Sequence, residues 1–197
     1  MTLCLAVKAM LTEFKIKSSK LKNEKPKIVT NLSTTQALKD ICDGLGAELI
    51  LTPIGEINVS KKMMEVNALA GGEGNGGVII PAIGYGRDSL TGMAVILNYL
   101  CQSGKKISEL AQEIPEYKVI KDKIEFSPDI QLNAWYQKLK NLFSKAKVNQ
   151  EDGVKFSFED SSWVHVRESN TEPIVRIIAE AKEIEKIQSL IKKVKDS

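Results

Sequence analysis

The first half of the chain alternates between predicted strands and predicted helices. Apolar residues run together in PKIVTNLS (26–33) and AELILTPIG (47–55), as in strands, and between them they recur at helical spacing. Ser33 and Gln36 stand at capping-box spacing before this helix, and two glycines end it. Its predicted apolar face is Leu38, Ile41, Cys42 and Leu45. A strand–helix–strand unit indicates a parallel α/β layer.

More helices are predicted on either side of this unit. The chain opens on an amphipathic helix without a cap, so we expect it to be cut from a longer protein. A short helix from Ser60 to about Val66 precedes a glycine-rich loop, and VIIPAIG (78–84) after it has β character. Asp88 then caps a longer helix that Gly104 ends. The apolar faces are Leu3, Val7, Met10, Leu11 and Phe14 in the first helix, and Leu90, Met93, Ala94, Leu97, Leu100 and Cys101 in the last.

From about Tyr117 the pattern changes. A strand is predicted at 118–126 and a helix starting at Ser127–Asp129. Three short strands follow at 154–158, 162–169 and 173–181, before a final helix. The apolar sides are Ile130, Trp135, Leu139, Leu142 and Phe143 in one helix, and Ile184, Ile187, Ile191 and Val194 in the other. Strands gathered between helices indicate an α+β unit. We therefore predict two domains, 1–115 and 116–197.

Composition excludes several classes of protein. A net charge of +3 and a hydrophobic fraction of 43% describe a globular protein, not a dedicated nucleic-acid binder. The lysines between Lys15 and Lys27 are interpreted as a solvated connection, because no aromatic residue from Ile16 to Lys27 could stack on bases. No apolar run approaches the ~20 residues of a membrane span. We expect no nucleic-acid and no membrane partner.

The cysteines indicate a reducing compartment. Cys4, Cys42 and Cys101 are odd in number and form no C-x-x-C pair, so neither a disulfide nor a metal site is expected. We interpret them as three small buried hydrophobic residues and expect a cytoplasmic protein.

The loop GGEGNGG (71–77) contains the G-x-G-x-x-G spacing of a dinucleotide site. Such a site needs a helix directly after the glycines, whereas VIIP follows here, and no Lys-Ser or Lys-Thr completes a P-loop. A nucleotide-dependent oxidoreductase is therefore disfavoured. A carboxylate accepts two hydrogen bonds and an amide both donates and accepts, so Glu73 and Asn75 suit two adjacent sugar hydroxyls. A flexible turn with incidental polar residues remains the alternative.

The segment WVHVRESNTEPIVR (163–176) suits an anion. Strand alternation places Arg167 beside a turn of hydrogen-bonding residues, and Arg176 lies on the returning strand. The turn consists of Glu168, Ser169, Asn170, Thr171 and Glu172. Guanidinium groups with neutral donors are the set that phosphate prefers. An exposed turn with a surface arginine is the alternative. For His165, the single histidine, a structural or substrate-edge role is favoured over a general base.

These two loops, in this order, resemble those of the α-D-phosphohexomutases. The family's sugar loop G-E-x-[SN]-G is found at 72–76, and its phosphate loop R-x-S-N-T-x-P-x-x-R at 167–176. The stretches VTNLSTT (29–35), G-E-x-x-V (55–59) and GRDSLTG (86–92) are similar too. The resemblance implies a three-layer αβα domain with a mixed sheet, the family's third domain. A smaller α+β domain of TATA-box-binding-protein-like fold, the fourth, follows it.

The resemblance also implies roles for residues. Glu73, Asn75 and Gly76 would bind the sugar, with Glu56 adding selectivity, and the fourth-domain loop would grip the phosphate that is not reacting. Its residues are Arg167, Ser169, Asn170, Thr171 and Arg176. The family's phosphoserine donates its phosphoryl group to the sugar, and the resulting hexose bisphosphate reorients and returns the other phosphate. Many bacterial members have G-E-x-S-G-H, with Ser and His where this chain has Asn75 and Gly77. The form found here resembles phosphoglucosamine mutases or phosphogluco/phosphomannomutases, with a lean toward the former.

The family's T-A-S-H-N-type serine loop and its D-x-D-x-D-R loop for Mg²⁺ are not found in this sequence. The resemblance therefore implies the C-terminal half of a mutase, with no catalytic residue and no metal ligand of its own. Its partners would be hexose phosphate, hexose bisphosphate and the missing N-terminal catalytic domains. A non-catalytic sugar-phosphate-binding protein is the alternative.

We expect this chain alone to have no mutase activity, because the nucleophile and the metal loop are both missing from it. Turnover of glucose 1-phosphate or glucosamine 6-phosphate by the purified chain would contradict this expectation.

Overall fold

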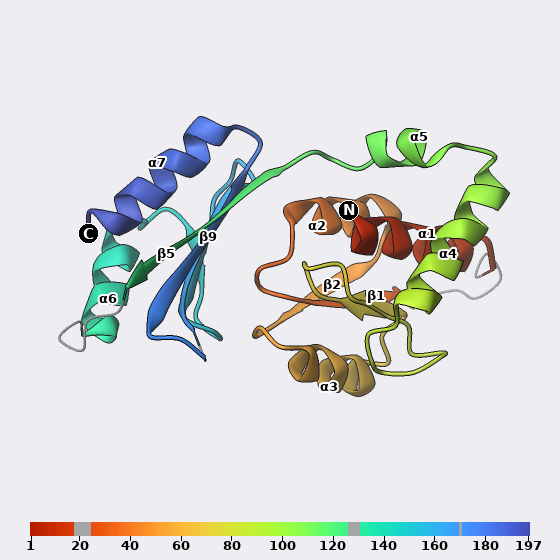
Figure 1. The fold of residues 1–197 in the computed structure, drawn as a ribbon, viewed down its shortest axis with the longest axis horizontal. Coiled ribbons are helices and arrows are strands. Elements are labelled where there is room, and N and C mark those ends of the chain that lie inside the picture. Colours follow the sequence, from red (N-terminus) through yellow and green to blue (C-terminus); the bar gives the residue numbers. More distant parts are fainter. Residues whose placement is uncertain (18–24, 126–130, 170) are drawn as a thin grey trace. The chain divides into compact units, whose positions relative to one another are not determined.

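The computed structural model describes residues 1–17, 25–125, 131–169 and 171–197. The chain divides into two compact units, Met1–Pro115 and Glu116–Ser197, and each is described by itself (Figure 1). The helix start predicted at Ser127–Asp129 and the predicted helix residue Ile130 lie outside the described residues.

The first unit is built on a four-stranded sheet. Its strands are β1 (Lys27–Asn31), β2 (Glu48–Thr52), β3 (Ala70–Gly72) and β4 (Val78–Ile79), in the order β2-β1-β3-β4. β1 is parallel to β2 and β3, and β4 is antiparallel to β3. The sheet is therefore mixed, as predicted.

Helices cover both faces of this sheet. α1 (Thr2–Lys17) and α2 (Gln36–Leu45) lie on one face and α3 (Glu56–Val66) on the other (Figure 1). α4 (Ser89–Ser103) packs against α1 and β4, and α5 (Ile107–Gln112) follows it. This arrangement confirms the three-layer αβα prediction.

A glycine in β3 lets α3 lie close to the sheet. A Cβ at Gly71 would lie 2.5 Å from the carbonyl oxygen of Val29 and 2.7 Å from Sδ of Met63. Because real Cβ atoms do not approach other atoms so closely, a side chain here would displace the backbone of β1 and the Met63 side chain of α3. The strand β3 was not predicted from the sequence, since glycine is usually depleted in strands. The first glycines of the loop are thus part of the sheet.

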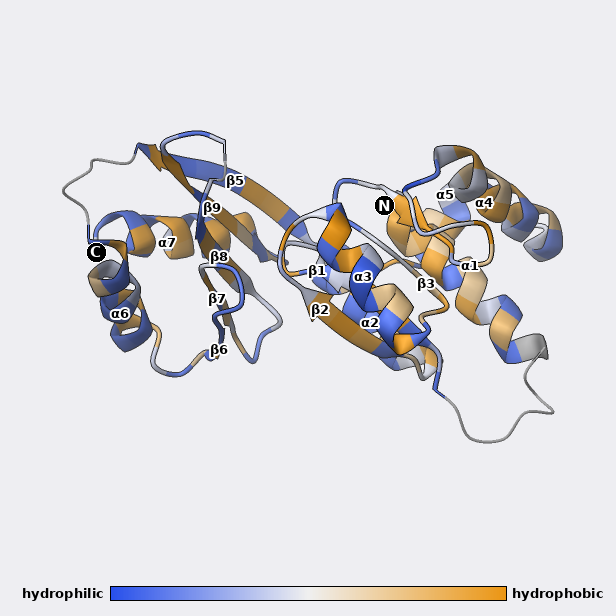
Figure 2. Cartoon of the chain, turned by 90° about the horizontal axis from the view of Figure 1, so that it is seen from below, coloured by the Kyte–Doolittle hydropathy of each residue, from blue (hydrophilic) through white to orange (hydrophobic). Residues whose placement is uncertain are grey.

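Three details of the predicted helices are wrong. α2 is capped by Thr35, whose Oγ1 accepts from the backbone N–H of Ala37, and not by Ser33. α3 begins at Glu56 rather than near Ser60, since Gly55, at φ 124°, provides its start without a side-chain cap. α1 was predicted to be amphipathic, but over Leu3–Val7 it is buried on all sides. It contacts α2, α4 and the sheet there. The start of α1 is accordingly orange in Figure 2.

The predicted apolar face of α4 does not face the core. Leu90, Met93 and Leu97 are exposed, and the side chain of Cys101, predicted to be buried, is exposed as well. The helix packs through the neighbouring stripe instead, which includes Gly92, Val95, Ile96 and Tyr99. A helix with apolar residues all round offers two such stripes, and periodicity alone does not choose between them. The caps at Asp88 and Gly104 are confirmed.

The second unit has a five-stranded antiparallel sheet in the order β5-β9-β8-β7-β6. The strands are β5 (Lys118–Glu125), β6 (Lys147–Asn149), β7 (Val154–Ser157), β8 (Trp163–Glu168) and β9 (Ile174–Ala181). α6 (Leu132–Leu142) and α7 (Ile184–Lys195) lie on one face, over a core that includes Val164, Val166 and Ile177 (Figure 1). The predicted α+β fold is confirmed, although β6 was not predicted.

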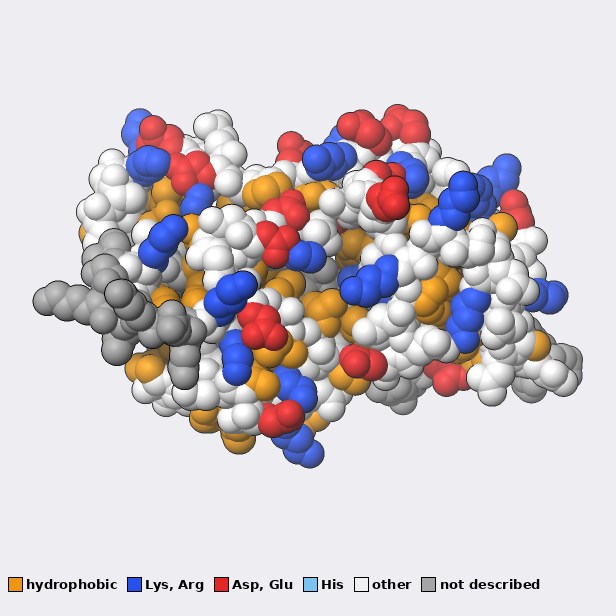
Figure 3. Space-filling view, turned by 180° about the vertical axis from the view of Figure 1, so that it is seen from behind, with side chains coloured by type: hydrophobic (Ala, Val, Ile, Leu, Met, Phe, Trp, Pro, Cys, Tyr) orange, Lys and Arg blue, Asp and Glu red, His pale blue; other side chains and the backbone are white. Residues whose placement is uncertain are grey.

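The surface carries both signs of charge. On the face drawn in Figure 3, Lys and Arg side chains are interspersed with Asp and Glu rather than gathered in one patch. Within the described ranges, no helix is both long enough and apolar enough to cross a membrane. Cys4 and Cys42 are buried as predicted, and burial raises the pKa of the Cys42 thiol to about 12.

His165 is fully buried in β8. Its Nε2 lies 2.6 Å from the backbone carbonyl oxygen of Asp152. Burial lowers the pKa of His165 from 6.5 to about 4, against the opposing effect of that hydrogen bond. The neutral imidazole is therefore the form that the fold accommodates, which supports a structural role.

We expect the second unit to lose stability in acid because of His165. Its folded-state pKa lies below its unfolded value, so the contribution is complete above about pH 6.5 and is lost as the pH falls toward 4. The loss amounts to about 3 kcal/mol. Urea unfolding followed by tryptophan fluorescence measures it, since Trp135 and Trp163 both lie in this unit. His165→Gln should remove the part of the slope between pH 6.5 and 4, and an unchanged slope would contradict the assignment.

Candidate functional site

The glycine-rich loop is a tight turn between β3 and β4. The backbone N–H of Glu73 donates to the carbonyl oxygen of Gly77 (3.1 Å), and that of Gly76 donates to the carbonyl oxygen of Glu73 (3.0 Å). The strand β4 follows directly, so the helix N-terminus that a dinucleotide site requires does not follow the loop, as the sequence indicated.

Gly72 is required by close packing, and Gly74 lies tightly against neighbouring backbone. A Cβ at Gly72, where φ is 150°, would lie 1.9 Å from the carbonyl oxygen of Gly77. A Cβ at Gly74 would lie 3.1 Å from the carbonyl oxygen of Ser33 and from Cα of Thr34. The loop therefore rests against the segment between β1 and α2, and its path is fixed by contacts with the backbone.

Glu73 is the buried polar residue of this loop, with 7% of its surface exposed. Its Oε1 accepts from Nδ2 of Asn31 (3.0 Å), and Asn31 Oδ1 accepts from the backbone N–H of Ser33 and from Oγ1 of Thr34. These bonds fix the Asn31 amide, which in turn fixes the Glu73 carboxylate. Asn31 was not predicted as a site residue; its place at the carboxyl end of β1, beside the loop, is the signal that could have indicated it.

Arg87 joins Glu73 to the start of α3. Its Nε donates to Oε2 of Glu56 (2.7 Å), and its Nη1 lies 3.7 Å from Oε2 of Glu73. The backbone N–H of Arg87 also donates to Oε1 of Glu56 (3.0 Å). The hydrogen bond from this N–H, followed by that from the guanidinium, lowers the pKa of Glu56. The structure thus brings Glu56 and Glu73 together through an arginine that the sequence analysis did not single out.

Asn75 and Gly76 lie at the outer end of the loop. Asn75 is exposed, and its Oδ1 accepts from the backbone N–H of Gly77 (3.1 Å). Gly76 is partly exposed and has φ 102°, a conformation that favours glycine. The amide nitrogen of Asn75 and the carboxylate of Glu73 therefore belong to one short turn.

The second loop joins β8 to β9. Arg167 and Arg176 are a directly opposed pair of these two strands, so their side chains leave the same face of the sheet. The backbone N–H of Ser169 donates to the carbonyl oxygen of Ile174 (2.9 Å), and Oγ of Ser169 lies 3.4 Å from Oγ1 of Thr171. Asn170, also predicted as a site residue, lies outside the described residues.

Arg167 is held by a carboxylate. Its Nε lies 3.0 Å from Oδ1 of Asp152, and only 6% of its surface is exposed. Gly153 makes this approach possible: at φ 64°, a Cβ there would lie 2.7 Å from Cβ of Arg167 and 2.3 Å from the carbonyl oxygen of Val166. Asp152 was not predicted, although the Asp-Gly pair before a strand is a turn signal. The ion pair orients the guanidinium.

Arg176 is more accessible. Its Nη2 lies 2.9 Å from Oε2 of Glu172, and 44% of its side chain is exposed. On the other side of β9, Lys123 is the residue directly opposite Arg176. Three cations, Lys123, Arg176 and Arg167, thus stand in one row across three strands, and opposed like charges are unfavourable unless an anion offsets them. Lys123 was not predicted; its register with Arg176 is visible only in the paired sheet.

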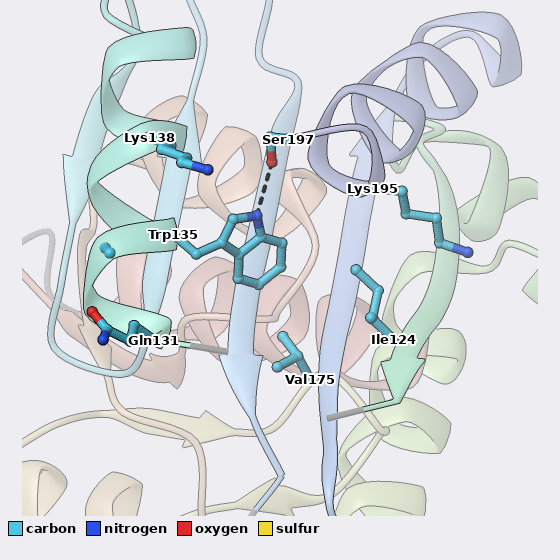
Figure 4. Close-up of a pocket in the computed structure, with 8 residues that line it drawn as sticks. Ile124, Gln131, Trp135, Lys138, Val175, Lys195 and Ser197 are labelled. Carbon is cyan, nitrogen blue, oxygen red and sulfur yellow. Dashed lines mark hydrogen bonds between the residues drawn. The ribbon is translucent and has the colours of Figure 1, made fainter. Parts of the chain in front are cut away.

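Among the described residues, neither a metal cluster nor the cavity beside Trp135 adds to these two loops. No group of three or more His, Cys, Asp or Glu residues could hold a metal ion in the part of the chain that the structure describes. A cavity of about 470 Å³ lies beside Trp135, whose Nε1 donates to Oγ of Ser197 (2.8 Å), with Ile124 and Val175 on neighbouring strands (Figure 4). None of the predicted site residues described by the structure lines it.

Both units match known protein families. Residues 2–117 match the model for "Phosphoglucomutase/phosphomannomutase, alpha/beta/alpha domain III", and residues 97–197 match that for the "C-terminal domain" of the same family. The order of the two matches along the chain is the order expected from the two loops.

Individual relatives agree with these matches. The chain is 40% identical over 166 residues to a phosphoglucomutase/phosphomannomutase of Thermococcus kodakarensis. This alignment covers 83% of the chain and 36% of the relative. It is 33% identical over 171 residues to a phosphoglucosamine/phosphogalactosamine mutase of Sulfurisphaera tokodaii, covering 86% and 37%. The chain therefore spans little more than a third of the length of these relatives.

A solved structure shows the same fold. It is the N-acetylphosphoglucosamine mutase of Aspergillus fumigatus in complex with GlcNAc-6P and magnesium, which superimposes with a TM-score of 0.68 at 15% identity. The match covers 98% of this chain and 42% of the other. From the two family matches and these relatives, the chain belongs to the phosphoglucomutase/phosphomannomutase family, of which it contains domain III and the C-terminal domain.

Proposed function

We propose that the chain is the substrate-binding part of a phosphohexomutase, which interconverts hexose 1-phosphate and hexose 6-phosphate. The observation that carries the proposal is the opposed pair of Arg167 and Arg176 beside the hydroxyls of Ser169 and Thr171. The names of the relatives and the GlcNAc-6P in the Aspergillus fumigatus structure support a hexose phosphate as the ligand.

Residues 1–115 form the sugar-binding domain in this proposal. A carboxylate has about four acceptor positions, and the Glu73 carboxylate contacts Asn31 with one oxygen and Arg87 with the other. Its remaining acceptor capacity suits a ring hydroxyl. The exposed amide of Asn75 and the backbone at Gly76 bind the adjacent hydroxyl, and Glu56 contributes selectivity.

Residues 116–197 form the phosphate-binding domain. Arg167, oriented by Asp152, and Arg176 donate to the phosphate oxygens, and Ser169, Asn170 and Thr171 provide neutral donors. The ion pair between Arg176 and Glu172 is exposed and therefore weak, so a phosphate dianion can replace the carboxylate. The domain holds the phosphate that is not reacting.

In this proposal, one domain binds the sugar and the other binds the phosphate that is not reacting, and the reaction itself takes place at residues outside this chain. A phosphoserine outside this chain transfers its phosphoryl group to the sugar, and the bisphosphate intermediate reorients before it returns the other phosphate. Magnesium supplies charge neutralisation during phosphoryl transfer in enzymes of this kind. Among the described residues, no three His, Cys, Asp or Glu side chains lie together in a group that could hold a metal ion. The relatives carry both phosphoglucosamine and phosphoglucomutase/phosphomannomutase names, and the loop form favours a phosphoglucosamine or a phosphogluco/phosphomannomutase activity.

A protein that binds sugar phosphates without catalysis is the second candidate, favoured by the same loops.

We expect Arg176→Gln to weaken the binding of both inorganic phosphate and glucose 6-phosphate to the chain by about tenfold or more, since a hydrogen bond to a charged group is lost. Isothermal titration calorimetry measures both dissociation constants. Lys147→Gln on β6, at the far edge of the same sheet, changes the net charge equally and should leave both unchanged. Equal affinities in the wild type and Arg176→Gln would contradict the phosphate site.

Glu73→Gln should distinguish the binding of the sugar ring from the binding of the phosphate group. We expect weaker binding of glucose 6-phosphate, because an acceptor-only carboxylate becomes an amide that donates on one side. Inorganic phosphate should bind as before, since it has no ring hydroxyls. Loss of affinity for both ligands, or for neither, is the result that excludes a sugar-reading role for this loop.

A further inference from the structure

We propose that Arg87 is the positioning residue of the sugar-binding loop and that position 77 is a glycine so that Arg87 can reach Glu73. This inference rests on the sugar-binding role proposed for Glu73. It assigns no contact with the ligand to Arg87, which acts by fixing the carboxylates of Glu56 and Glu73 relative to each other.

The contacts of Arg87 join two segments far apart in the sequence. Its Nε donates to Glu56 at the first turn of α3, and its Nη1 lies 3.7 Å from Glu73 in the loop after β3. The guanidinium is a planar, rigid group, so a bond to one carboxylate fixes the direction in which it meets the other. Asn31 holds one oxygen of Glu73 and Arg87 faces the second. Together they determine where the acceptor positions of Glu73 point.

The space for the Arg87 side chain comes from Gly77. A Cβ at this position would lie 2.1 Å from Cδ and 2.7 Å from Cγ of Arg87. The backbone conformation of Gly77 does not require a glycine, because its φ is not positive. Gly77 is therefore required by the arginine that crosses it, and not by the turn that contains it. An alanine here displaces the arginine without altering either carboxylate.

The backbone near Arg87 is anchored without its guanidinium. The N–H of Arg87 donates to Glu56, the hydroxyl of Ser60 donates to the carbonyl oxygen of Tyr85 (2.6 Å), and the N–H of Asp88 donates to the carbonyl oxygen of Val78 (3.0 Å). The Arg87 side chain is 44% exposed, and exposed ion pairs contribute little to folding stability. Removing the guanidinium should therefore leave the fold in place and release only the carboxylates.

Three single variants and one double variant test the inference by calorimetry with glucose 6-phosphate and with inorganic phosphate. We expect Arg87→Met and Gly77→Ala each to weaken glucose 6-phosphate binding about tenfold and to leave inorganic phosphate binding unchanged. Because both act by removing the same contact, the double variant should be no weaker than Arg87→Met alone. Gly84→Ala is the matched control, since a Cβ at Gly84 would meet nothing within 4 Å. Thermal unfolding of each variant should match the wild type within a few degrees.

The outcomes separate this inference from the function on which it rests. If Arg87→Met and Gly77→Ala bind glucose 6-phosphate as the wild type does while Glu73→Gln binds it more weakly, the positioning role is overturned and the sugar site stands. If Glu73→Gln also binds normally, both fall. Fully additive losses in the double variant would show that Gly77 and Arg87 act separately, and they would overturn the inference as well.

Discussion

Each candidate loop depends on an arginine that lies against a glycine with no room for a Cβ. Arg87 crosses Gly77 and is held by Glu56, and Arg167 crosses next to Gly153 and is held by Asp152. In both cases the glycine permits the close approach and the carboxylate fixes the direction of the guanidinium. An arginine that is already oriented loses less conformational freedom when it binds a ligand, as proposed for Arg167. The oriented Arg87 instead holds the two carboxylates beside it in place.

The two sheets provide the rigid frame for this arrangement. In the first unit, β3 lies in the sheet between β1 and β4, so the turn that carries Glu73 starts from a strand paired on both sides. In the second unit, β8 and β9 are both interior strands, and the candidate phosphate loop connects them. Polar groups on such strand ends are held more accurately than groups on long loops. The accuracy is what a site for ring hydroxyls and phosphate oxygens requires.

The sequence predicted the elements well and the contacts poorly. The strand and helix periods located most elements, the cap at Asp88 was correct, and the two loop motifs indicated the right family, because all of these are local signals. The outward stripe of α4 was misjudged because apolar spacing does not say which neighbour a helix packs against. The strand β3 was missed because its glycines contradict strand propensity, and only contacts distant in sequence explain them: Val29 and Met63 at Gly71, and Gly77 at Gly72.

The same limit applies to the candidate sites. Glu73 and Arg167 stand in recognisable motifs, whereas Asn31, Arg87 and Asp152 are distant in sequence from the residues they orient. Their spacing carries no pattern, since the pairing follows from the register of strands and the path of loops. Residues that act through another residue are therefore the part of a site that a single sequence shows least.

The glycines of the loop are required for different reasons. Gly71 leaves room for the backbone of β1 and for Met63 of the helix behind the sheet, and Gly72 leaves room for the carbonyl oxygen across the turn. A descendant of this chain without the proposed sugar site would still need both glycines, since a side chain at either position would clash with the backbone. Retention of this glycine pair therefore reflects folding, and Glu73, Asn75 and Gly77 are the positions at which loss of the proposed site would show.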